Sequence, residues 1–366
     1  MMPAPAALPG TMQAVVLRGH GGPEQLDFRD DVAVPVPAAD EVLIQVGAAA
    51  LNNTDINTRV GWYSKSVASA TASLANDRAP RPEEPADGNW SGQPFVFPRI
   101  QGLDACGRIV ATGSGVSAGR IGERVLVDPV LRPGKGSGFQ VQYVGLERDG
   151  AFAQYLAVPS CNAHRIESPL SDVELACFPC AYGTAQNLVQ RAGVRDGDTV
   201  LVTGASGGVG SAAVQLARLQ GATVVAITQA DKAGVVAGLG ASRTLARTDD
   251  LLQALGRDSV GVVIDVVGGA AFGRLLDVLC PGGRYAVAGA IAGPLVQLDL
   301  RTLYLKDLTL LGCTVTTAAQ FAALVQRIEQ GQLRPVVGAV YPLRQLREAQ
   351  DAFLSKAHAG KIVLVP

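Results

Sequence analysis

A run of small residues from Gly204 to Gly210 has the types and spacing of a turn that binds phosphate. Its pattern is Ala205-x-Gly207-x-x-Gly210, so an alanine takes the place of the first glycine of the usual fingerprint. Gly207 would let the backbone approach a pyrophosphate, and Gly210 would let a helix pack close to a strand. The first N–H groups of that helix would attract the anion. A glycine-rich turn without a ligand is the alternative that this pattern leaves open.

The turn stands between a predicted strand and a predicted helix, which is the context that the fingerprint requires. Residues 199–202 are a short apolar run rich in β-branched side chains, as in a buried strand. After the turn, Ala213, Leu216, Ala217 and Leu219 recur at helical spacing. The sequence therefore predicts a dinucleotide held by Ala205, Ser206, Gly207, Gly208 and Val209.

A second predicted strand, residues 223–227, ends where such a unit meets the adenosine ribose. The acidic residue that usually holds the ribose 2′-hydroxyl is absent there, and Thr228 takes its place. Lys232 and Arg247 follow, and cations at this edge suit a 2′-phosphate, so NADP is favoured over NAD. Asp231 could still reach a ribose and keeps NAD open as the alternative.

The composition is that of a globular enzyme. The 366 residues are enough for two domains, each with its own core. The net charge of −1 implies no broad attraction to nucleic acid or to a membrane surface. No apolar run approaches the ~20 residues of a membrane span. The six cysteines do not form a disulfide framework, which favours a reducing cytoplasm.

The pattern of elements changes along the chain. Short strands with many turn residues fill the first part and predict a β-rich domain of barrel type. From about residue 171, strands alternate with helices, which predicts a doubly wound parallel sheet. We therefore expect an α/β protein in which residues 1–168 and 322–366 form the substrate domain and residues 169–321 bind NADP. Residues 63–98 are expected to be an insertion at the mouth of the substrate cleft, either a lid or a passive loop.

The motifs together resemble the medium-chain dehydrogenase/reductase superfamily, on its zinc-independent quinone oxidoreductase side. The resemblance extends from Met12 to Pro366, with the insertion as the main departure. It implies a GroES-like catalytic domain, built from both ends of the chain, around a Rossmann domain. Besides the glycine turn, the segments that carry it are residues 51–63, 102–113, 150–155, 178–185, 282–289 and 360–364.

The resemblance also identifies where a catalytic zinc would bind in zinc-dependent relatives. Those positions hold Asn52, Leu103 and Cys180 here, and of these only the cysteine could be a ligand. The three histidines, His20, His164 and His358, are distant from these motifs in sequence. We therefore expect no metal ion, and we expect the chemistry to rest on the nicotinamide.

Two residues are candidates for catalysis by resemblance. Asn52 is implied near the nicotinamide and the substrate oxygen. Tyr63 matches the tyrosine that related enoyl thioester reductases place near the reacting carbon, where a phenol could protonate the α-carbon or bind an enolate oxygen. An aromatic anchor at the root of the insertion is the alternative for Tyr63. Residues implied on the nicotinamide side are Thr184, Val267, Gly268, Gly289 and Ala290.

Lys361 is a candidate contact to a phosphate or a ribose, with a solvated surface lysine as the alternative.

The leading hypothesis for the whole chain is a zinc-free, NADPH-dependent reductase of a quinone or an activated C=C bond. The alternatives are an enoyl thioester reductase, a non-catalytic NADPH-binding protein and, disfavoured by the ligand positions, a zinc alcohol dehydrogenase. The apolar segment 308–315 further predicts a homodimer, because an unpaired apolar sheet edge is a liability in a monomer.

Overall fold

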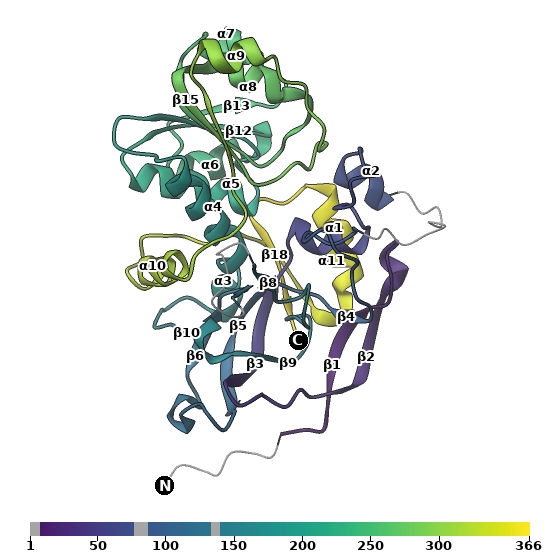
Figure 1. The fold of residues 1–366 in the computed structure, drawn as a ribbon. Helices are drawn as coiled ribbons and strands as arrows, with labels where there is room; N and C mark the ends of the chain where they lie inside the picture. Colours follow the sequence, from purple (N-terminus) through teal and green to yellow (C-terminus); the bar gives the residue numbers. More distant parts are fainter. Residues whose placement is uncertain (1–7, 77–86, 133–139) are drawn as a thin grey trace.

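The computed structural model describes residues 8–76, 87–132 and 140–366, which form two lobes (Figure 1). The upper lobe contains the middle of the chain, in teal and green. The lower lobe contains the first part, in purple and blue, together with the yellow C-terminal helix α11 (Leu346–Ser355) and strand β18 (Lys361–Val365). The two ends of the chain therefore build one domain, and the middle builds the other.

Among the described residues, six parallel strands form the sheet of the upper lobe, in the order β13-β12-β11-β14-β15-β16. This order reverses between β11 and β14, as in a doubly wound fold. The strands are apolar runs such as Val200–Val202 because helices bury both faces of the sheet. Their bounds are β11 Thr199–Val202, β12 Thr223–Thr228, β13 Arg243–Ala246, β14 Val260–Asp265, β15 Leu279–Val287 and β16 Thr309–Gly312.

Two apolar cores hold the helices of this lobe against the two faces of its sheet. Residues of α4, α5, α6 and α10 belong to one core, and residues of α7, α8 and α9 belong to the other. The helices are α4 Pro179–Arg191, α5 Gly208–Leu219, α6 Ala233–Gly238, α7 Leu251–Leu255, α8 Phe272–Val278, α9 Leu300–Leu305 and α10 Ala318–Glu329.

The lower lobe contains a mainly antiparallel sheet in the order β10-β6-β5-β3-β18-β17, with β9 also paired to β3, and a smaller sheet β2-β1-β4. Strand β18 pairs with β3 through Val363 and Ala50, so the last strand returns to the first domain as predicted. The bounds are β1 Thr11–Leu17, β2 Leu26–Ala33, β3 Glu41–Ala50, β4 Arg99–Ile100, β5 Asp104–Thr112, β6 Arg124–Val127, β9 Tyr155–Pro159, β10 Ala163–Arg165 and β17 Val337–Pro342, with helices α1 Asn53–Arg59, α2 Thr71–Asn76 and α3 Asp172–Leu175.

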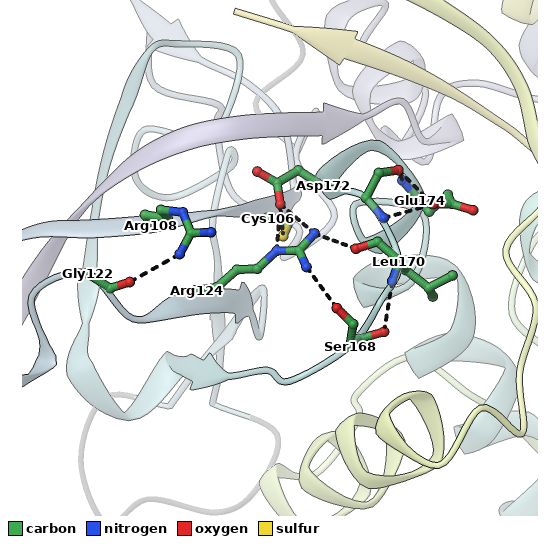
Figure 2. A network of polar contacts seen from close by, with 9 residues as sticks. Cys106, Arg108, Gly122, Arg124, Ser168, Leu170, Asp172 and Glu174 are labelled. Atoms are coloured by element: carbon green, nitrogen blue, oxygen red, sulfur yellow. Dashed lines mark hydrogen bonds and ion pairs between the residues drawn. The ribbon is translucent and has the colours of Figure 1, made fainter.

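Arg124 holds the chain where it leaves the lower lobe (Figure 2). Its guanidinium donates to Asp172 Oδ1 at 2.6 Å, to the Ser168 carbonyl oxygen at 3.1 Å and to the Leu170 carbonyl oxygen at 2.6 Å. The Cys106 thiol also donates to Asp172, at 3.6 Å. One side chain of β6 therefore fixes the path of residues 168–172 toward the upper lobe.

The strand orders confirm the predicted α/β class, with a β-rich domain and a doubly wound domain of Rossmann type. The predicted domain limits at residues 168 and 321 stay predictions. Among the described strands β16 is an edge of the parallel sheet. Leu310 is exposed there, whereas Leu308 and Cys313 of the same segment are buried, and the dimer stays a prediction. All six cysteines are free, and the cytoplasmic location also stays a prediction. In the described ranges, no helix combines the length and the apolar character needed to cross a membrane.

Candidate functional site

A pocket of about 460 Å³ lies where the order of the parallel strands reverses. The turn after β11 forms one wall, through residues 206–210, and the loop after β14 forms another, through residues 265–268. Ligands of open α/β sheets bind at this reversal, beyond the carboxyl ends of the strands. The predicted phosphate turn therefore faces a pocket at the place where this fold type binds dinucleotides.

The turn is shaped by close contacts that only glycine permits at two positions. A Cβ on Gly210 would lie 2.2 Å from the Gly204 carbonyl oxygen, so the helix begins directly against the strand. A Cβ on Gly208 would lie 2.7 Å from Cδ of Lys361, so the turn rests on the stem of that lysine. The Gly360 N–H also donates to the Ser206 carbonyl oxygen at 2.7 Å. The chain that leads into β18 thus supports the turn from the other domain.

Cations gather at one end of the pocket. Lys232, Arg247 and Lys356 all line it, together with His358. In the described part of the chain none of the three cations forms an ion pair with a carboxylate. Asp249 also lines the pocket, but its carboxylate accepts the N–H of Ala246 at 2.8 Å. Positive charge without a carboxylate partner is the environment in which an anionic group such as a phosphate would bind.

The charge states of these groups reflect their crowding. Burial, together with repulsion from Arg247 and Lys232, lowers the pKa of Lys356 to about 8. Burial, with Lys356 and Lys232 next in effect, lowers the pKa of His358 to about 4. The Lys232 ammonium donates to Gln229 Oε1 at 2.5 Å and to the Lys356 carbonyl oxygen. A bound anion would stabilise the ammonium of Lys356 against this repulsion.

A buried carboxylate organises the other end of the pocket. Asp265 accepts hydrogen bonds from Thr203 Oγ1 at 2.5 Å and from the Tyr285 hydroxyl. It also accepts the N–H groups of Val267 at 2.8 Å and Gly268 at 3.2 Å. Thr203 precedes the glycine turn, so one carboxylate fixes the turn and the loop after β14 relative to each other.

Beneath the turn, a buried ion pair joins the two ends of the chain. The Lys361 ammonium donates to Asp104 Oδ2 at 2.8 Å and to Asn52 Oδ1 at 2.5 Å. Asn52 Nδ2 donates to Asp104 Oδ2 at 3.0 Å, and the Cys180 N–H donates to Asp104 Oδ1 at 2.6 Å. The side chains of Asp104 and Lys361 are 0% and 4% exposed. The surface-lysine alternative for Lys361 is therefore wrong.

This cluster coincides with the positions at which zinc-dependent relatives would hold their metal. Leu103 offers no donor atom, and burial raises the pKa of the Cys180 thiol to about 12. An ammonium already occupies the space between Asn52 and Asp104. Among the described residues, no three His, Cys, Asp or Glu side chains lie close enough to hold a metal ion. The donor set does not fit a catalytic zinc, which needs three protein ligands.

Tyr63 lies beside this cluster at the start of the insertion. Its hydroxyl donates to Thr54 Oγ1 at 3.3 Å, and its ring meets that of Trp62 edge to face. Burial raises the pKa of the phenol above its ordinary value of 10.0, and the nearby Cys180 and Asp55 add to the rise. The phenol is therefore neutral at physiological pH.

The structure brings most of the predicted cofactor residues to one pocket. Ser206, Gly207, Gly208, Val209, Lys232, Arg247, Val267 and Gly268 line it. The remaining predicted residues do not line it. Ala290 packs against Gly268, and Gly289 packs against Val266. Thr184 lies close to the Cys180 thiol. The other three residues, Ala205, Thr228 and Lys361, are buried.

Sequence reasoning missed Asp104, Asp265, Lys356, His358 and Thr71. Lys356 and His358 stand only a few residues before Lys361, so the predicted role of that lysine was a signal for them. Asp265 directly precedes the predicted Val267–Gly268 contact, which was a similar signal. Nothing in the sequence connects Thr71 with the pocket.

Comparisons with known proteins agree with this architecture. Residues 38–168 match the model of the alcohol dehydrogenase GroES-like domain. Residues 239–364 match the model of a zinc-binding dehydrogenase. The words 'zinc-binding' describe that family as a whole. In this chain the corresponding ligand positions hold Asn52, Leu103 and Cys180.

Individual relatives cover the chain almost from end to end. The quinone oxidoreductase of Lama guanicoe is 30% identical over 97% of this chain and 97% of its own length. The acryloyl-coenzyme A reductase of Metallosphaera sedula is 30% identical over 96% of this chain and 99% of its own. The crystal structure of a candidate alcohol dehydrogenase from Sinorhizobium meliloti 1021 is 46% identical, with a TM-score of 0.89 over 99% of this chain and 98% of that one.

Proposed function

Since the chain belongs to the medium-chain dehydrogenase/reductase superfamily, we propose that it is an NADPH-dependent, zinc-independent reductase of quinones or activated C=C bonds. The pocket at the strand reversal carries this proposal, because it joins a phosphate turn to three unpaired cations. When bound there, NADPH supplies the hydride, and the protein supplies position and electrostatics. Ser206 to Val209 would hold the pyrophosphate, and Lys232, Arg247 and Lys356 would hold the 2′-phosphate.

The buried cluster supports an acceptor that needs no metal. A simple ketone requires strong polarisation of its oxygen, whereas a quinone or an enone delocalises the charge that hydride transfer creates. Two neutral groups belong to this region, the phenol of Tyr63 and the amide of Asn52. Hydrogen bonds to Lys361 and Asp104 hold the Asn52 amide in place. We propose that Tyr63 donates a hydrogen bond or a proton to the developing enolate.

A substrate panel tests this reaction. We expect NADPH oxidation with phenanthrenequinone and with a simple enone, and we expect a zinc chelator to leave the rate unchanged. The proposal fails if turnover needs zinc and an aliphatic ketone or alcohol is the preferred substrate. Tight NADPH binding without turnover on any member of the panel would indicate a non-catalytic NADPH-binding protein instead.

A thioester reductase is the second candidate, because the acryloyl-coenzyme A reductase is as similar to this chain as the quinone oxidoreductase. Acryloyl and crotonyl thioesters also present an activated C=C bond to the hydride. Crotonyl-CoA belongs in the same panel, and a kcat/KM well above those of the quinone and the free enone would favour this candidate.

The choice of cofactor is tested at Lys356. Replacing it with alanine should weaken NADPH binding about 10- to 100-fold, because a charge-assisted hydrogen bond to the phosphate is lost, and should leave NADH binding unchanged. NADPH affinity of the wild type should fall as the pH rises through about 8, where the Lys356 ammonium loses its proton. Lys356→Arg is the control, because arginine stays charged and should flatten this dependence. Equal losses for both cofactors would contradict a 2′-phosphate contact.

A further inference from the structure

The insertion reaches across to the other domain through helix α2. The N–H of Thr71, the first residue of α2, donates to the Ile291 carbonyl oxygen at 3.1 Å. Ile291 lies in the loop that follows β15 in the nucleotide domain. Figure 1 shows α2 beside α1, on the side of the lower lobe that faces the upper one. This backbone hydrogen bond links helix α2 to the opposite domain.

On its own side, α2 is firmly anchored. The Thr71 hydroxyl, which is buried, donates to Asn57 Oδ1 of α1 at 2.9 Å. Trp62 Nε1 donates to the Ser69 carbonyl oxygen at 3.0 Å. Ala75 is packed into the apolar core of the substrate domain. These contacts fix the start of α2 to the lower lobe whether or not it contacts the nucleotide domain.

On the opposite side, Ile291 belongs to the wall of the pocket. The N–H of Ala292 donates to the Val267 carbonyl oxygen at 2.9 Å. Ala290 packs closely on Gly268, because a Cβ added to Gly268 would lie 3.0 Å from the Cα of Ala290. Thr71, Ala72, Ile291 and Ala292 all line the same pocket as the phosphate turn. The contact between the domains therefore lies along the pocket that would contain the dinucleotide.

We propose that α2 is a retention strap, which closes over the bound dinucleotide and slows its release. The Thr71–Ile291 hydrogen bond joins two walls of the pocket, so it must break before the domains can separate along this side. The inference rests on the proposed function in one respect, that a nicotinamide dinucleotide binds in this pocket. It makes helix α2 a determinant of cofactor residence time.

The chain offers a matched pair of variants for the test. Thr71→Pro removes the N–H donor, and proline is well tolerated at the first position of a helix. Thr71→Ala keeps that N–H, and both variants lose the hydroxyl bond to Asn57. We expect stopped-flow measurements to show NADPH leaving Thr71→Pro about 2- to 10-fold faster than Thr71→Ala, as for the loss of one hydrogen bond. If cofactor release limits turnover, kcat should rise in the same variant.

A second measurement needs no variant. Hydrogen–deuterium exchange of the wild type should show slower exchange of the Thr71 amide when NADPH saturates the protein. Equal release rates for the two variants, or an amide that exchanges independently of cofactor, would overturn the strap. Preferential binding of NADH would overturn only the cofactor choice, and the same release experiments would then use NADH. A protein that binds neither dinucleotide would overturn the strap together with the proposed function.

Discussion

Replacing Lys361 with methionine should lower the free energy of unfolding by about 3–5 kcal/mol, because it leaves the Asp104 carboxylate buried without its partner. Both side chains are almost fully buried, and the ammonium also binds Asn52. Chemical denaturation monitored by circular dichroism measures this loss. Arg29→Met is the matched control, because the Arg29–Asp31 pair is exposed and its removal should leave the unfolding midpoint nearly unchanged.

The double variant Lys361→Met, Asp104→Leu distinguishes the contribution of the ion pair from the cost of leaving one charge buried without a partner. It removes both charges, so it should be more stable than Lys361→Met alone. A Lys361→Met protein as stable as Arg29→Met would show that the buried pair contributes nothing. A double variant less stable than the single one would show instead that Asp104 acts mainly through the N–H of Cys180 and the amide of Asn52.

Tyr63→Phe should lower kcat for the preferred substrate about 100-fold or more, if the phenol donates a proton or a hydrogen bond in the transition state. Phenylalanine keeps the ring contact with Trp62, so the change isolates the hydroxyl. Steady-state and single-turnover kinetics measure the effect, and the dissociation constant of NADPH should not change. If the variant retains nearly full activity, Tyr63 is the aromatic anchor at the root of the insertion.

Tyr143→Phe is the control for this variant. Tyr143 is also a buried phenol close to Cys180 and Tyr63, but its hydroxyl donates to the Thr314 carbonyl oxygen at 3.5 Å. We expect its removal to change kcat little. The pH profile adds a second readout, because burial raises the pKa of Tyr63 and the phenol stays protonated across the physiological range. A break in the profile near pH 7 would report Asp55, whose pKa burial raises to about 7.

Local features of the sequence were enough to predict the glycine turn and the strand and helix on either side of it. The spacing of Gly207 and Gly210 determines how close a strand and the next helix can lie, so the wall of the pocket follows from a dozen neighbouring residues. The parallel sheet follows in the same way from alternating apolar runs. The predicted cations Lys232 and Arg247 also line the pocket, because both follow the strands that end there.

Contacts between distant parts of the chain could not be predicted in this way. Asp104 and Lys361 are 257 positions apart, and nothing in either segment indicates that they form an ion pair. Lys356 enters the pocket from the loop between α11 and β18. The sequence predicted that this segment returns to the first domain, but not which of its side chains reach the pocket. The same holds for Thr71, whose partner Ile291 lies in the other domain. Sequence therefore predicted one wall of the site and missed most of the wall that the other domain supplies.

The isolated β-bridge between Gly207 and Gly360 limits which segments of the chain can be exchanged with those of a relative. A chimaera that grafts residues 199–312 onto another scaffold would carry the glycine turn but would lose the backbone that supports it and the Lys361 stem beneath Gly208. The graft would also lack Lys356, for which we propose a role in cofactor preference, because that residue lies in the C-terminal segment. An exchange that preserves the site has to include the segment from α11 to the end of β18 together with the Rossmann sheet.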